Sequence, residues 1–88
     1  MKIVKISSLA CPSCIIMNKV FNKAKEKFNF EYEEYDFDLE HYEIQKYNPG
    51  NKLPLYIIFK DGKEVNRIIG EYKEEDFDNI IKEYLWKE

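Results

Sequence analysis

The order of strand-like and helix-like segments in the first half of the chain is the feature that most restricts its fold. The segment 3–7 is short, mostly apolar and rich in β-branched side chains, which is typical of a buried strand. Apolar residues then recur at helical spacing from Pro12 to about residue 28, with lysines mostly between them. The predicted apolar stripe of this helix consists of Ile15, Ile16, Met17, Val20, Phe21, Ala24 and Phe28.

A second strand is predicted over residues 30–37, where aromatic and acidic side chains alternate. Its acidic side chains suit the edge of a sheet, because charge discourages pairing with other chains. The alternation slips at Glu33-Glu34, which predicts a bulge there. Since a crossover helix separates the two strands, we expect them to be parallel neighbours.

The second half of the chain predicts, in order, a short helix, a hairpin of two strands and a final helix. The predicted ranges are 39–47 and 73–87 for the helices, and 55–59 and 64–69 for the strands. Asp38 is placed to cap the short helix, and Asp61-Gly62 is among the strongest short hairpin signals. The order βαβ-α-ββ-α predicts an α/β fold with a four-stranded mixed sheet flanked by helices.

Length and charge fit one small globular domain, which we assign to residues 1–88. A net charge of −3 with interspersed signs argues against nucleic acid as a partner, because phosphate binding needs a clustered basic surface. The sequence holds no apolar run of membrane-spanning length, and its charged opening residues do not fit a secretory signal. We expect a cytoplasmic protein without nucleic-acid or membrane partners, and we expect it to be a monomer.

The two cysteines lie three residues apart, in the motif Cys11-Pro12-Ser13-Cys14 at the predicted start of the first helix. At a helix N-terminus, unpaired backbone N–H groups and the positive end of the dipole favour a thiolate over a thiol. Pro12 suits the first helical position, because that residue needs no N–H donor. Cys14 lies one turn inside the helix, where it can attack a mixed disulfide formed by Cys11.

A metal site is the main alternative for the cysteine pair. A structural zinc ion usually takes four ligands, whereas this chain offers two cysteines and one histidine, His41, on a different predicted helix. A purely structural disulfide is a weaker alternative, because a bridge across so few residues restrains little of the unfolded chain.

Several segments outside the cysteine motif resemble the thioredoxin superfamily. They are Tyr35-Asp36-Phe37-Asp38, Leu53-Pro54, the hairpin Phe59–Val65 and the run Arg67–Gly70. The similarity covers essentially the whole chain, and it implies a thioredoxin-like fold and thiol:disulfide exchange with protein disulfides. Taken alone, Leu53-Pro54 favours an ordinary trans peptide bond, but the resemblance implies a cis one.

The resemblance also implies a role for each site residue. Cys11 is expected to be the attacking thiol and Cys14 the resolving thiol, with a redox-active Cys11–Cys14 disulfide and no bound cofactor or metal. The backbone of Leu53, next to Pro54, is expected to pair with an extended substrate segment. The other expected substrate-binding residues are Pro12, Ser13 and Gly70.

Two segments of the sequence point to different branches of the superfamily. Cys-Pro-Ser-Cys resembles the glutaredoxin motif more than that of thioredoxins. Glutaredoxins, however, carry paired glycines where this chain has Gly70-Glu71, and the Glu71 carboxylate would repel an anionic tripeptide. We therefore expect a thioredoxin-reductase-type electron donor rather than glutathione. A glutathione-dependent glutaredoxin is one alternative, and a metal-binding or protein-interaction module on the same fold is another.

Lys5 stands where thioredoxins carry a buried acid that assists proton transfer. We expect its side chain to face outward with a solvated head. An inward Lys5 would instead favour the Cys11 thiolate, but it could not serve as the carboxylate base.

Overall fold

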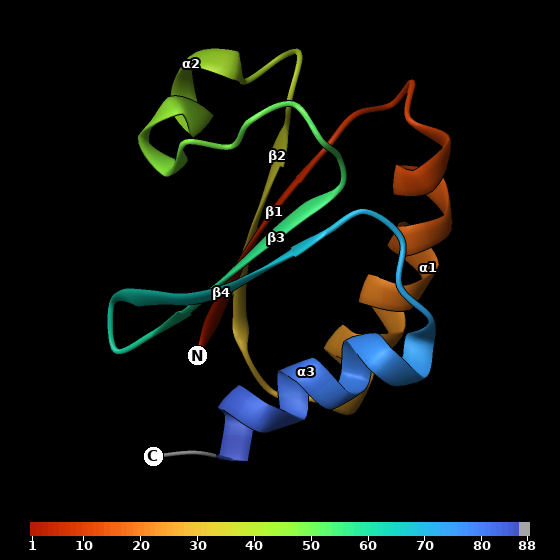
Figure 1. Cartoon of the computed structure of the whole chain (residues 1–88), viewed down its shortest axis with the longest axis vertical. Coiled ribbons are helices and arrows are strands. Elements are labelled where there is room, and N and C mark those ends of the chain that lie inside the picture. The colour runs from red at the N-terminus through yellow and green to blue at the C-terminus, as the bar shows by residue number, and fades with distance from the viewer. Residues whose placement is uncertain (87–88) are drawn as a thin grey trace.

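The computed structural model describes residues 1–86, and the elements follow one another in the predicted order (Figure 1). The strands are β1 (Lys2–Ser7), β2 (Glu31–Asp36), β3 (Leu55–Lys60) and β4 (Lys63–Ile69). The helices are α1 (Pro12–Lys27), α2 (His41–Ile44), the 3-10 turn η1 (Gln45–Tyr47) and α3 (Glu74–Trp86). Residue 87, the predicted end of the last helix, lies outside the described residues. No helix within residues 1–86 combines the length and the apolar character that crossing a membrane requires.

The strands form one mixed sheet in the order β2-β1-β3-β4, which confirms the predicted four-stranded fold and the edge position of β2. β1 and β2 are parallel, with Lys2 opposite Glu31 and Ser7 opposite Asp36, and the other two pairs are antiparallel. The bulge predicted at Glu33-Glu34 is wrong, because the β1–β2 register continues unbroken through those residues. No residue of β2 is fully buried, so its aromatic–acidic alternation does not follow one core-facing side. An irregularity occurs instead in the hairpin, between Ile58 and Phe59.

The helix predicted over residues 39–47 begins later, and the prediction that Asp38 caps it is wrong. The Asp36 side chain accepts hydrogen bonds from the backbone N–H groups of Asp38, at 2.9 Å, and Leu39, at 2.8 Å. These bonds hold the chain in a turn before α2 begins. The Asp38 carboxylate itself accepts a hydrogen bond from the Ser8 hydroxyl at 2.8 Å.

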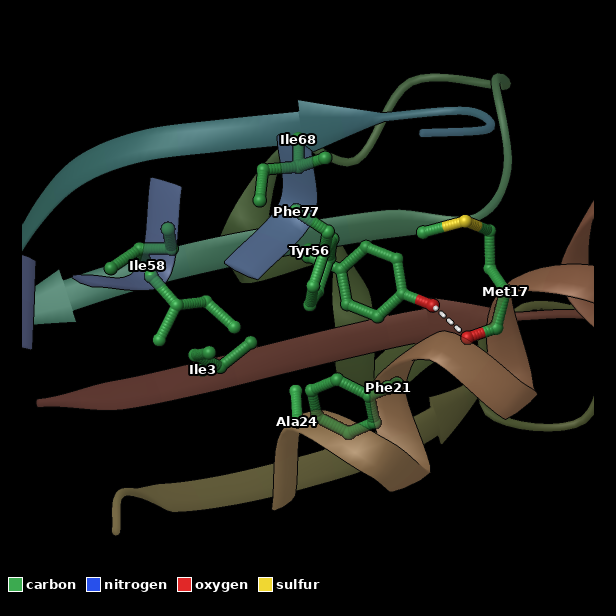
Figure 2. Close-up of a cluster of buried hydrophobic side chains, with 9 residues drawn as sticks. Ile3, Met17, Phe21, Ala24, Tyr56, Ile58, Ile68 and Phe77 are labelled. Atoms are coloured by element: carbon green, nitrogen blue, oxygen red, sulfur yellow. Dashed lines mark hydrogen bonds between the residues drawn. The ribbon is translucent and has the colours of Figure 1, made fainter. Parts of the chain in front are cut away.

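Buried side chains cover both faces of the sheet, because α1 and α3 lie on one side and α2 on the other (Figure 1). Figure 2 shows most of the larger cluster, which consists of Ile3, Met17, Phe21, Ala24, Tyr56, Ile58, Ile68, Phe77 and Ile81. The cluster on the opposite face consists of Val4, Ile6, Ile44, Leu55 and Ile57. Successive residues of β1 and β3 therefore enter opposite clusters, as the two-residue period of a strand requires. The two central strands give the loops at their ends a rigid base.

Candidate active site

The cysteine motif lies at one end of the sheet, where three connecting segments meet. Ile6, near the end of β1, pairs with Leu55 at the start of β3, and Leu55 pairs with Ile69 at the end of β4. The loop after β1, the proline dipeptide before β3 and Gly70 after β4 therefore emerge at the same end. The fold brings together the segments that the sequence predicts to form the site.

Cys11 is the N-cap residue of α1, and its sulfur accepts a hydrogen bond from the helix backbone. Its backbone is extended, with φ −104° and ψ 111°, and the N–H of Cys14 donates to its Sγ at 3.1 Å. Pro12 lies in the first helical turn, as predicted. The sulfur therefore faces a backbone N–H donor at the positive end of the helix dipole. The side chain is half-buried, so a substrate can reach it.

Cys14 is the buried member of the pair. Its side chain is 1% exposed, and burial, followed by the hydrogen bond with Cys11, raises the pKa of its thiol to about 11. The Ser8 backbone and the Lys5 cation lower this pKa but only partly offset burial. Both cysteines are free thiols. The two thiols therefore differ as an attacking and a resolving thiol should, with Cys11 accessible and Cys14 protonated at neutral pH.

The Leu53-Pro54 peptide bond is cis, which confirms the geometry implied by the family resemblance. The trans bond favoured by the dipeptide alone is wrong, because local preference for trans is small before proline and the surrounding fold decides the isomer. Pro54 is buried and Leu53 is half-buried. The backbone N–H of Gly70, at a φ of 82°, donates to the Pro54 carbonyl at 2.9 Å. This bond ties the end of β4 to the proline loop.

Ser13, between the two cysteines, forms a side-chain contact that the sequence did not reveal. Its hydroxyl donates to Oε1 of Glu71 at 2.8 Å. Gly70 and Glu71 are thereby connected to both the proline loop and the cysteine motif. A contact between residues this far apart in the chain leaves no local pattern in the sequence.

Lys5 is buried, and the expectation that it faces outward is wrong. Its side chain is 8% exposed, and Nζ donates to Oδ1 of Asn18 at 2.5 Å and to Oε1 of Glu34 at 3.3 Å. Because Ile3 points into the cluster beneath α1, the strand period directs Lys5 to the same face. Its ammonium group is paired there with Glu34 on the edge strand, and its other partner, Asn18, lies one helical turn after Cys14 on α1.

Replacing Lys5 with methionine is expected to slow the resolving step. Without the cation, the pKa of Cys14 rises, since burial is then less offset. Less of the thiol is then ionised, and the greater nucleophilicity of the remaining thiolate offsets this loss only in part, so the net effect is a slower reaction. The measurement is the second phase of the stopped-flow reaction with 5,5′-dithiobis(2-nitrobenzoate), in which Cys14 displaces thionitrobenzoate from Cys11. The control is Lys19→Met, on the exposed side of α1. Equal rates of the second phase in the two variants would contradict the role of Lys5.

Apolar side chains at the site are more exposed than the helical pattern predicts. Ile15 is 58% and Ile16 is 51% exposed, so their assignment to the buried stripe of α1 is wrong. The buried face is narrower and is defined by Cys14, Met17, Phe21 and Ala24. Leu9, before the motif, is 85% exposed. Sequence periodicity could not separate this apolar rim from the core, because the apolar stripe is wider than the buried face.

Outside the cysteine motif, the other candidates for a functional site are a metal-ligand group, the lone histidine and a surface hollow. Within residues 1–86, no group of three or more His, Cys, Asp or Glu side chains could hold a metal ion. His41 is exposed on α2, where its ring lies 5.7 Å from that of Phe37. A hollow of about 730 Å³, lined by residues such as Met1, Phe30 and Gly62, lies at the opposite end of the sheet.

We compared the sequence and the fold with those of known proteins. No family model matches the chain, and no curated protein matches it in sequence. Among solved structures, a mutant thioredoxin of Halobacterium salinarum NRC-1 superposes with a TM-score of 0.87 at 18% identity, covering 99% of this chain and 76% of that one. Thioredoxin 1 of Thermosipho africanus TCF52B gives 0.83 at 21% identity, covering 97% and 94% of the two chains.

The thioredoxin of Fasciola hepatica combines structural similarity with higher sequence identity. It is 30% identical to this chain, with a TM-score of 0.77, over 94% of this chain and 79% of that one. The strand order, the cis-proline before β3 and the cysteine pair at the start of α1 agree with this similarity. The chain belongs to the thioredoxin superfamily.

Proposed function

We propose that this protein is a thiol:disulfide oxidoreductase that reduces disulfides of other proteins by dithiol exchange. The observation that carries the proposal is the inequality of the cysteine pair. Cys11 is accessible and accepts a hydrogen bond at its sulfur, whereas Cys14 is buried with a raised thiol pKa. The similarity to thioredoxins supports the same chemistry.

In the first step, the Cys11 thiolate attacks one sulfur of the substrate disulfide. The substrate S–S bond breaks as the Cys11–substrate bond forms, and the released substrate sulfur takes up a proton. In the second step, Cys14 loses its proton and its thiolate attacks Sγ of Cys11. The mixed disulfide breaks, the Cys11–Cys14 disulfide forms, and the second substrate sulfur leaves and takes up a proton that balances the one lost by Cys14. The substrate has then gained two electrons from the dithiol and two protons, one of them from solvent.

The approach of the substrate is assigned to the segments around Cys11. An extended substrate segment would pair with the backbone of Leu53 beside the cis-proline, with Pro12, Ser13 and Gly70 completing the contact surface. The exposed side chains of Leu9 and Ile15 supply apolar area next to the motif, which suits a protein substrate.

The oxidised protein needs an electron donor that reduces the Cys11–Cys14 disulfide again. We propose a donor of the thioredoxin-reductase type rather than glutathione, because the Glu71 carboxylate is held against Ser13 within the motif and would repel an anionic tripeptide. We place the activity in the cytoplasm, where paired thiols are kept reduced, and we propose that the protein acts as a monomer.

Insulin reduction tests the proposed activity. With dithiothreitol as donor, the protein should accelerate precipitation of the free insulin chains, and NADPH consumption should be faster with thioredoxin reductase than with glutathione and its reductase. Failure with dithiothreitol would contradict disulfide reduction itself. Faster turnover with glutathione would favour the glutaredoxin alternative, and stoichiometric zinc in protein purified under reducing conditions would favour a metal-binding module.

A further inference from the structure

Glu71 places a negative charge against the cysteine motif. Its Oε1 accepts the hydrogen bond from Ser13 Oγ at 2.8 Å. Ser13 lies between the accessible Cys11 and the buried Cys14, so the carboxylate stands at the mouth of the site.

The backbone on both sides of Glu71 is anchored to other parts of the site. The N–H of Gly70 donates to the Pro54 carbonyl at 2.9 Å, and the N–H of Tyr72 donates to Sδ of Met17 at 3.4 Å. The first contact reaches the proline loop and the second reaches α1. The backbone is thus anchored on both sides of Glu71, which keeps its carboxylate within reach of Ser13.

A second carboxylate is bonded to the loop that precedes the motif. Asp38 accepts a hydrogen bond from the hydroxyl of Ser8, three residues before Cys11, at 2.8 Å. The exposed lysines nearest to these segments in the sequence are Lys52 and Lys73, and within residues 1–86 neither is held to the motif by a hydrogen bond or ion pair. The buried Lys5 cation is also fixed, but it is paired with Glu34. The exposed charged groups that hydrogen bonds hold at these segments are therefore the carboxylates of Glu71 and Asp38.

We propose that Glu71 selects substrates by charge, so that the site prefers disulfides flanked by neutral or basic groups over disulfides flanked by carboxylates. This inference rests on the proposed disulfide exchange and names its substrate class. The reacting sulfur must come within bonding distance of Cys11, two residues from the Ser13 that holds Glu71, so its neighbouring groups approach this carboxylate. The Debye length at physiological ionic strength is about 8 Å, and closer charges are only partly screened. Like charges therefore slow the encounter.

Three small alkyl disulfides of different charge test the proposal. They are dithiodipropionate, which is anionic, hydroxyethyl disulfide, which is neutral, and cystamine, which is cationic. Each is mixed in excess with reduced protein, and free thiols are counted by mass spectrometry after acid quenching. Rates with the two charged reagents are divided by the rate of the same variant with the neutral one, so that any effect on the thiol cancels.

Glu71→Gln is expected to lower the ratio of cationic to anionic rates about three- to tenfold, and about 1 M salt should remove most of the difference between the variant and the wild type. Glu75→Gln is the matched control, because it changes net charge equally at an exposed residue in the first turn of α3, and it should keep the wild-type ratio. A wild-type ratio in Glu71→Gln, or an equal fall in both variants, would overturn the selection by Glu71. If the wild-type protein reacts with none of the three disulfides, the proposed function fails instead.

Discussion

Replacing Cys11 with serine is expected to reduce insulin reduction to the background rate. The serine hydroxyl keeps the size of the side chain and can still accept the N–H of Cys14, but it does not ionise near neutral pH and cannot form a disulfide. The nucleophile of the first step is therefore lost while the helix cap is retained. The measurement is insulin precipitation with dithiothreitol, beside the wild-type protein at equal concentration.

The matched variant for this experiment is Cys14→Ser, which keeps the attacking thiol and removes the resolving one. It should form one covalent mixed disulfide per protein through Cys11, detectable as an added mass under non-reducing conditions, and turn over poorly. Full activity in Cys11→Ser, or an adduct carried by Cys14 in the wild-type protein, would contradict the assigned order of attack.

Replacing Phe21 with alanine is expected to lower the free energy of unfolding by about 3–5 kcal/mol. Phe21 is 0% exposed, and its ring centroid lies 5.2 Å from that of Tyr56 and 6.4 Å from that of Phe77. The truncation leaves a cavity where α1 packs on the sheet and α3. Such a loss is a large share of the roughly 5–15 kcal/mol that stabilises a domain. Urea unfolding, followed by far-UV circular dichroism, provides the measurement.

Two further variants test whether the loss of stability comes from the cavity left by Phe21. Phe21→Leu fills most of the cavity and should lose less than Phe21→Ala. Tyr42→Ala removes an aromatic ring that is 88% exposed, and it should change stability by no more than about 0.5 kcal/mol. A loss below about 1 kcal/mol in Phe21→Ala would show that the packing of α1 on the sheet contributes little.

Local sequence patterns were sufficient to predict the buried strands and α1, but not the details of the edge strand β2 or of the turn before α2. The period-2 and helical patterns of β1, α1 and the β3–β4 hairpin reflect burial, and burial dominates their stability. On β2 no residue is fully buried, so the slipped alternation at Glu33-Glu34 had no structural meaning. Asp38 looked like a helix cap because capping residues are also turn residues, and here the turn formed by Asp36 is the favoured structure.

The cysteine pair could be placed from the sequence because a strand, a loop and a helix start determine its position. The Ser13–Glu71 contact could not, since it depends on how the segment after β4 returns to α1. The inward direction of Lys5 could in principle have been predicted, because Lys5 is two residues from Ile3 on the same strand. Its charge argued for solvent, and only the structure reveals Glu34 and Asn18 as its partners.

The burial of β1 and β3 on both faces governs how the backbone exchanges its amide hydrogens with water. We expect the amide hydrogens of these strands to exchange only when most of the domain opens, whereas those of β2 and the loops can exchange through local opening. Cys11 is the N-cap of α1 and follows the short loop at the end of β1. In the proposed cycle, the Cys11 sulfur could therefore change covalent partners while the strands that position it stay closed.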